Sequence, residues 1–232
     1  MRRENMATQS ICFNTFKFTK KYTVCDIVEI LNSVNCKSEK FIINDYDDKL
    51  IDGLYVISVP SKEIKFNMIT NTYESEEVVK NIVTNFVIDV ESEIIEIWGN
   101  RINSQRILTK LALQFNNNVI IDSIKIDLLQ VILSLKKYKF KVGKVKIEDV
   151  LLKETLIATC MFDLTNHEQP YKILEEYKSK ITQISATINE VSGQLLTIAI
   201  FSSGSILVYR SREDIGEEVL SIIRKVCIGG GI

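Results

Sequence analysis

Few residues of this chain have the type and spacing that catalysis or metal binding requires. His167 is the only histidine among 232 residues, so the chain holds no cluster of imidazole ligands for a transition metal. A nucleophile–histidine–acid triad would depend on this single residue. The glycines at positions 229–231 end the chain without a following helix, which is unlike a phosphate-binding loop. We therefore predict a non-enzymatic protein that uses no cofactor and no metal.

The cysteines predict free thiols. They are odd in number, scattered, without a Cys-x-x-Cys pair and mostly among apolar neighbours: Cys12, Cys25, Cys36, Cys160 and Cys227. Buried, reduced thiols of an intracellular protein explain this pattern better than disulfides or a metal site. No apolar segment follows the first five residues, and no stretch approaches the roughly 20 apolar residues of a membrane span. We expect an intracellular protein, in cytoplasm or nucleus, that is neither secreted nor inserted in a membrane.

Two charged clusters stand out. Asp45, Asp47 and Asp48 have a spacing that could suggest a cation site, but the glycine and distal glutamate of a calcium loop are missing, which favours a solvated turn. Lysines alternate with aromatic and apolar residues over positions 136–146. On a strand Lys137, Lys139 and Lys141 would share one face, where they could contact phosphates or simply face solvent. The net charge of −1 gives no overall sign of a nucleic-acid partner.

Hydrophobic periodicity predicts one order of elements twice, strand–helix–strand–hairpin–helix. In the N-terminal copy these are residues 11–18, 23–34, 40–44, a hairpin of 53–60 and 62–70 with its corner at Pro60-Ser61, and 75–84. In the C-terminal copy they are residues 154–163, 170–180, 181–191, 195–209 and 212–226. We predict an α+β protein with a mobile leader (1–8), repeats at 9–88 and 152–228, a central insert (89–151) and a tail (229–232).

The boundary between the first repeat and the insert carries a further hairpin, formed by residues 86–90 and 93–98. A helix over 104–115 and a loop at 116–118 follow it. Residues 120–135 are apolar enough for either a strand or a helix, and periodicity does not decide between them.

The hairpin at residues 195–209 has the clearest local signals. Thr197, Ala199 and Phe201 alternate with two isoleucines, and Gly204 supplies the positive φ of a tight turn. Ser211 then precedes two acidic residues, which is typical of the start of a helix.

The letters TIAIFSSGSILVY (197–209) resemble the hairpin of the TATA-box-binding protein family, which typically reads LLIFSSGKIVLTGAKS. The letters LIATC (156–160) are similar to the family's first strand, often IVGSC. The sequence departs from the pattern at Tyr209-Arg210, where the family has Thr-Gly. It departs again at Ile184-Ser185-Ala186, where the family has Phe-Pro-Gly, and the N-terminal copy lacks the SSG turn.

The resemblance implies two repeats that form a curved antiparallel sheet, with the helices on one face and DNA on the other. Family members insert phenylalanines between base steps of the minor groove. The resemblance places Phe201 at one wedge and Ile184 at its mate. The other DNA-facing residues that it implies are Ala186, Ile188, Ala199, Leu207, Tyr209 and Thr155. Alternation adds Glu190 to this face, where its carboxylate would repel phosphate.

The implied function is non-enzymatic binding of AT-rich duplex DNA in transcription initiation or a related nucleoprotein assembly, together with other transcription or assembly factors. The alternative is a structural or adaptor subunit that binds a protein through the same sheet face or edge. Weak basicity, Glu190 and the altered wedge pair favour this alternative, and the C-terminal motif favours DNA. Phe201 as an ordinary core residue also remains open.

Overall fold

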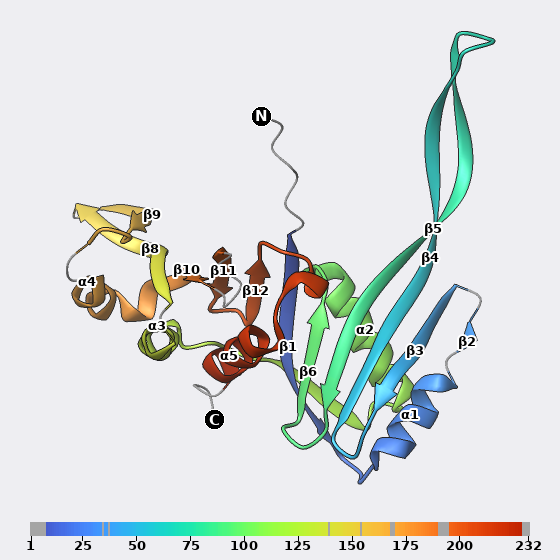
Figure 1. Cartoon of the computed structure of the whole chain (residues 1–232), viewed down its shortest axis with the longest axis horizontal. Helices are drawn as coiled ribbons and strands as arrows, with labels where there is room; N and C mark the ends of the chain where they lie inside the picture. Colours follow the sequence, from blue (N-terminus) through green and yellow to red (C-terminus); the bar gives the residue numbers. More distant parts are fainter. Residues whose placement is uncertain are drawn as a thin grey trace. The chain divides into compact units, whose positions relative to one another are not determined.

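The structure, a computed structural model, describes residues 8–33, 35–36, 38–138, 140–153, 155–167, 170–189 and 195–228. Antiparallel sheets and helices make it a mixed α+β fold, which confirms the predicted class (Figure 1). The chain divides into two compact units. We call Phe16–Ile121 the arm unit, and Met1–Thr15 with Asp122–Ile232 the terminal unit. These divisions differ from the expected repeat boundaries. The expected tail, and the leader apart from Thr8, lie outside the described residues.

Helix α1 (Val24–Asn32) of the arm unit begins where its sequence predicts. The side chain of Thr23 accepts a hydrogen bond from the backbone of Asp26, and the carboxylate of Asp26 accepts one from the backbone of Thr23. This reciprocal capping box satisfies N–H groups that have no partner inside the helix. The helix buries its apolar stripe, Ile27 and Leu31 completely.

The sheet of the arm unit contains strands β2 (Asn35–Cys36), β3 (Glu39–Tyr46), β4 (Leu50–Asn67), β5 (Thr72–Asp89) and β6 (Ile94–Trp98), in that spatial order. Each of these neighbouring strands pairs antiparallel with the next. The end of strand β1 (Gln9–Phe18) adjoins this sheet, since the N–H of Phe16 donates to the carbonyl of Glu93 at 2.8 Å. Helix α2 (Arg101–Gln114) follows β6, and one apolar cluster joins α1, α2 and one sheet face. The predicted hairpin at 86–98 and the helix at 104–115 are confirmed.

Two expectations in this unit are wrong. Strand β4 continues through Pro60 and Ser61, so no corner lies there, and residues 75–84 belong to strand β5 instead of a helix. Proline interrupts a sheet least on an edge, and Pro60 lies where β4 pairs with β5 alone. The β-branched residues of the 75–84 segment suit the pleated pairing that β4 offers.

The terminal unit is also built on antiparallel strands. Its strands are β8 (Lys141–Lys153), β9 (Leu156–Asp163), β10 (Ile181–Asn189), β11 (Leu195–Phe201) and β12 (Ser205–Val208), in the order β12-β11-β10-β8-β9. The first residues of β1 pair with β12. Strand β7 (Val119–Ser123) also pairs with β1. The helices are α3 (Leu128–Lys137), α4 (Pro170–Glu176) and α5 (Glu217–Ile228), with short 3-10 turns at Lys178–Lys180 and Arg212–Asp214.

The C-terminal elements largely follow the sequence. Gly204 has a φ of +88° in the turn between β11 and β12, as predicted, and α5 buries Val219, Ile223 and Val226. Residues 120–135 contain both candidates, because β7 ends at Ser123 and α3 begins at Leu128. Lysine-rich residues 136–146 are not one strand, because α3 extends to Lys137 and β8 begins at Lys141.

Candidate interaction surfaces

The residues predicted to form one DNA-binding face do not all lie on the same side of the sheet. In the register of β10 and β11, Phe201 lies opposite Gln183, and Ile184 lies opposite Ile200. Directly opposed residues point to the same side of a sheet, so Phe201 and Ile184 point to opposite sides. Ile184 and Ala186 are fully buried, and Ile188 is nearly so. The expected wedge pair is therefore wrong, and these three residues belong to the core.

We call the face that carries Phe201 the open face of the terminal unit. Phe201 and Leu207 are half-buried there, Tyr209 is exposed just beyond the strand, and Ala199 is buried between its neighbours. Their neighbours on β10 are polar, and Thr187 and Thr197 share a hydrogen bond of 3.3 Å. Thr155 is exposed in the turn between β8 and β9, and Glu190 lies outside the described residues. The face thus combines small and polar groups with a few apolar ones.

The three predicted phosphate contacts are not on a common strand face. Lys137 ends helix α3, Lys141 starts β8, and both are exposed, while Lys139 lies outside the described residues. The register of β8 with β10 places two lysines on the open face, Lys141 opposite Thr187 and Lys146 opposite Gln183. The ammonium group of Lys146 lies 2.7 Å from the carboxylate of Glu148, so part of its charge is neutralised locally.

A second surface comes from the arm unit and was not predicted. Strand β3 pairs with residues 51–57 of β4, and β6 pairs with residues 85–89 of β5. Residues 58–67 and 72–81 pair with one another. Beyond the end of the sheet they form a two-stranded ribbon that extends away from the unit's other strands (Figure 1). We call residues 58–81 the arm.

The arm has two chemically different faces. The register pairs Pro60 with Val79, Lys62 with Glu77, Ile64 with Ser75, and Phe66 with Tyr73. These rows form what we call the apolar face. On it Ile64 is 73%, Tyr73 76% and Val79 70% exposed, and Ile69 in the terminal turn is 95% exposed. The rings of Phe66 and Tyr73 are in contact, with centroids 5.1 Å apart.

The opposite face of the arm is polar and satisfied within the chain. Glu63 pairs with Lys80 at 3.2 Å, and Lys65 pairs with Glu76. Asn67 donates to Glu74 at 2.7 Å, and its side-chain oxygen accepts from the backbone of Ile69 at 2.9 Å. These contacts order the ribbon and its turn by local interactions. The apolar face is left exposed to solvent.

A third feature is a polar network inside a groove of the arm unit. The hydroxyl of Tyr55 donates to Glu39 at 2.6 Å, and the ammonium of Lys110 donates to the other oxygen of the same carboxylate. The hydrogen bond from Lys110, then that from Tyr55, lowers the pKa of Glu39. Burial, followed by the hydrogen bond to Glu39, raises the pKa of Tyr55. The groove, of about 670 Å³, is also lined by Arg101 and Arg106 of α2.

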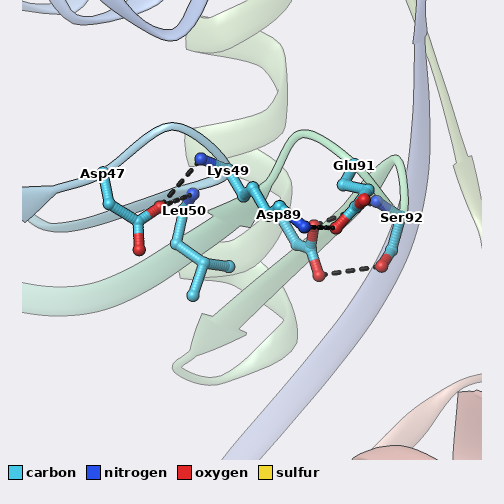
Figure 2. A network of polar contacts seen from close by, with 6 residues as sticks. All are labelled: Asp47, Lys49, Leu50, Asp89, Glu91 and Ser92. Atoms are coloured by element: carbon cyan, nitrogen blue, oxygen red, sulfur yellow. Dashed lines mark hydrogen bonds and ion pairs between the residues drawn. The ribbon is translucent and has the colours of Figure 1, made fainter.

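The predicted acidic turn is a structural turn. Asp47 accepts hydrogen bonds from the backbones of Lys49 and Leu50, each 2.8 Å long, and these lower the pKa of its carboxyl group (Figure 2). Lys49 pairs with Glu91 of the neighbouring turn at 2.7 Å. Asp47 therefore organises the backbone, as the interpretation of a solvated turn anticipates. Among the described residues, no group of acidic, cysteine or histidine side chains has the arrangement of a metal site.

The cysteines are free thiols, but they are less buried than predicted. Cys227 is buried, whereas Cys25 and Cys36 are exposed. Cys12 and Cys160 are intermediate.

No protein-family profile matches the chain, and a search of curated proteins finds no match. Of the helices in the described part of the chain, none has the length and hydropathy needed to cross a membrane. The functional argument therefore rests on the surfaces themselves.

Proposed function

We propose that this protein is a non-enzymatic structural or adaptor subunit that binds a protein partner through the arm. The observation that carries the proposal is the exposed apolar face of a ribbon whose other face is already satisfied by ion pairs. Monomeric proteins rarely expose contiguous apolar patches beyond about 300–600 Å² without using them for binding. A hairpin alone is marginally stable in water, and a partner on its apolar face would stabilise it.

The chemistry of the arm favours a protein over nucleic acid as its partner. Residues 58–81 contain four glutamates and three lysines. Two of those lysines, Lys65 and Lys80, already pair with glutamates of the same ribbon. Binding to a phosphate backbone relies on cations that are free to replace counterions. Aromatic and methionine side chains, as at Tyr73 and Met68, are enriched in protein interfaces.

Photo-crosslinking tests this proposal. A benzophenone amino acid at Val79 lies on the apolar face, and the same group at Lys80 lies on the charged face one residue away. In cells that naturally make the protein, we expect protein adducts from position 79 in clear excess over position 80. Equal adducts from both positions, or none from either, would show that the apolar face has no protein partner.

DNA binding through the open face of the terminal unit is the second candidate, favoured by the position of Phe201. This side chain is half-buried on a face that also carries Leu207, and the face lies opposite the buried Ile184. The proposed mode is minor-groove insertion into AT-rich duplex in transcription initiation or a related assembly. Without Ile184, the wedge would be a single residue.

The proposal of DNA binding also includes two related repeats, arranged as in the TATA-binding-protein family. Along the first half of the chain, β1, α1, the short strand β2, β3, the β4–β5 hairpin, β6 and α2 follow one another. In the second half, β9, α4, β10, the β11–β12 hairpin and α5 do so. Both successions fit strand–helix–strand–hairpin–helix, if β2 and β6 are added strands and α2 replaces the expected helix at 75–84. This shared order supports the proposal of two related repeats.

The second candidate is tested with Phe201→Ala. We expect a gel-shift titration with AT-rich duplex to show weaker binding and reduced bending together, because the wedge opens the base step. If Phe201 is instead a core residue, truncation would cost roughly 3–5 kcal/mol of unfolding free energy. Thermal melting of the same variant separates these results. Unchanged DNA affinity in a stable variant would exclude a wedge at Phe201.

A further inference from the structure

One charged row interrupts the apolar face of the arm. Lys62 and Glu77 are directly opposed on β4 and β5, between the row of Pro60 and the row of Ile64. In the described structure, neither of the two has a carboxylate or ammonium group within ion-pair distance. On the other face of the ribbon, Glu63, Lys65 and their partners do form ion pairs. A cation and an anion side by side are thus left available on the surface that we expect to be covered.

We propose that the partner on the apolar face is a second copy of this chain, and that two arms stack face to face about a twofold axis parallel to the ribbon. This inference rests on the proposed function and names its partner. In a twofold interface, residue i contacts residue j of the second copy, and j contacts i in return. The two copies bring the same apolar face to the interface, so its pattern must be complementary to itself.

The charged row decides between the possible axes. A twofold axis along the ribbon places β4 of one copy over β5 of the other. Lys62 then faces Glu77 of the second copy, and the symmetry repeats the pair. An axis across the ribbon would place β4 over β4, so that Lys62 would face Lys62 when this row lies at the axis. Like charges brought together in an interface cost several kcal/mol, so the charged row favours the parallel axis over an across-ribbon axis through this row.

The apolar rows fit the same axis. Phe66 of one copy faces Tyr73 of the other, and Pro60 faces Val79, because each row meets itself with its strands exchanged. Aromatic side chains carry about 150–250 Å² of surface each. With Ile64, Met68, Ile69 and Val79 exposed beside them, the patch approaches the roughly 800 Å² per partner of a stable interface.

The base of the arm leaves room for this stacking. Toward the sheet, the apolar face continues through Val83, which is exposed, and the alternate residues Thr84, Phe86 and Ile88 are buried on the opposite side. Phe86 and Ile88 pack in the cluster that contains α1 and α2. The helices of the arm unit therefore lie on the face that the second copy does not approach.

Charge reversal in the intact chain tests the inference. We expect wild-type protein to form dimers at micromolar concentrations in analytical ultracentrifugation. Lys62→Glu leaves two glutamates in the charged row of each arm and Glu77→Lys leaves two lysines in that row, so each variant alone should dimerise at least about tenfold more weakly, equivalent to 1.4 kcal/mol. When the two variants are mixed, every opposed pair is again attractive. We expect heterodimers, detected by native mass spectrometry, in clear excess over both homodimers.

Matched controls come from the charged face. Lys65→Glu and Glu76→Lys also disturb an ion pair within the ribbon, but on the side away from the second copy. Their mixture should show no preference for heterodimers. Circular dichroism melting of each variant checks that the fold is retained. Val79→Asp keeps the charges of Lys62 and Glu77 but would bury a carboxylate in the apolar contact. It should therefore abolish dimers, both alone and when mixed with the other variants.

Several results would overturn the inference. The first is a wild-type chain that stays monomeric at 100 μM, about the upper range of such measurements. The second is that the single variants dimerise as strongly as the wild type. The third is a mixture of the two variants that shows no preference for heterodimers. A monomeric wild type that still gives position-79 adducts with another protein would retain the proposed function and reject the second copy as partner. If the wild type forms neither dimers nor position-79 adducts, the proposed function and the second copy as partner are both rejected.

Discussion

Gly204 shows how one residue fixes the hairpin of the terminal unit. Its φ of +88° lies in the region that side chains disfavour, and a Cβ there would lie 2.1 Å from the carbonyl oxygen of Ile124. The carbonyl of Gly204 accepts from the N–H of Phe13 at 3.2 Å, which connects the turn to β1. Both the conformation and the close backbone contact therefore require glycine.

We expect Gly204→Ala to lower the free energy of unfolding by about 1–3 kcal/mol or more, because it adds backbone strain and a clash that flexible side chains cannot relieve. Chemical denaturation measures the change. Gly216→Ala is the matched control, since a Cβ there meets nothing within 4 Å. A Gly204 variant as stable as the Gly216 variant would contradict the turn geometry.

The thiols should differ in reactivity according to their burial. Burial raises the pKa of Cys227 to about 12, so its sulfur stays protonated near neutral pH. Cys25 and Cys36 are exposed. We expect a disulfide reagent at pH 8 to modify these two quickly and Cys227 only after denaturation, as peptide mass mapping will show. Rapid labelling of Cys227 in the native protein would contradict the packing of α5.

At the scale of elements, the contact of Lys110 with Glu39 connects helix α2 to strand β3, 71 residues away in the sequence. The side chains are 16% and 26% exposed, and the carboxylate also accepts from Tyr55. Removing the cation would leave a half-buried carboxylate with one donor fewer. Such losses cost more than those of pairs on the surface.

We expect Lys110→Met to lower the unfolding free energy by about 1–3 kcal/mol at pH 7. The folded-state pKa of Glu39 lies below its ordinary 4.5, so this contribution is complete above pH 4.5 and disappears as pH falls through the folded value. The difference between wild type and variant should therefore shrink in acid. Arg106→Met, on the same helix, should change stability by about 0.5 kcal/mol or less. Equal effects of the two variants would contradict a specific tether.

Local signals predicted elements well where the decisive contacts are local. The capping box at Thr23 and the turn glycine at position 204 act within a few residues, and α1 and the β11–β12 hairpin follow from them. The helix predicted for residues 75–84 is wrong because two glutamates near the start of this segment mimic a helix terminus. The β-branched residues at 78, 79, 82 and 83 also fit a helical stripe. In the structure these residues pair with β4, and a short stretch of sequence does not reveal such pairing between strands.

The candidate sites likewise depend on pairing between distant residues, which local signals do not reveal. Both faces of the β11–β12 hairpin carry apolar residues, so alternation does not decide which face is buried, and it was the family resemblance that placed Ile184 on the side of Phe201. The arm could have been found from the alternation of Ile64 and Phe66 with charged residues. That pattern was split by an expected corner at Pro60.

At the scale of the whole molecule, the arm adds surface without adding core. Its residues are exposed or half-buried, and none contributes to the fully buried set that includes Tyr55 and Phe86. A ribbon of this kind, retained at the cost of aggregation risk, suits a binding role better than a structural one. Folding and assembly should therefore be separable in this protein.

Shortening the arm tests that separation. Residues 59–80 are replaced by Asn-Gly, which favours the tight turn that can join Ser58 to Asn81. These two residues already oppose each other, with side-chain oxygens 2.8 Å apart. We expect the melting temperature of the shortened chain to stay within about 3 °C of the wild-type monomer, because less than about 1 kcal/mol of core packing is removed.

The same variant should be monomeric at every concentration at which the wild type dimerises, measured by sedimentation equilibrium. A second variant, Met68→Ser with Ile69→Ser, keeps the arm length and reduces only the apolar area of its tip, so it should weaken the dimer to an intermediate degree. If the shortened chain melted far below the wild type, the arm would be part of the folding core. If it folded normally and still dimerised, the contact between copies would have to lie on another surface, and the apolar face of the arm would need a different partner.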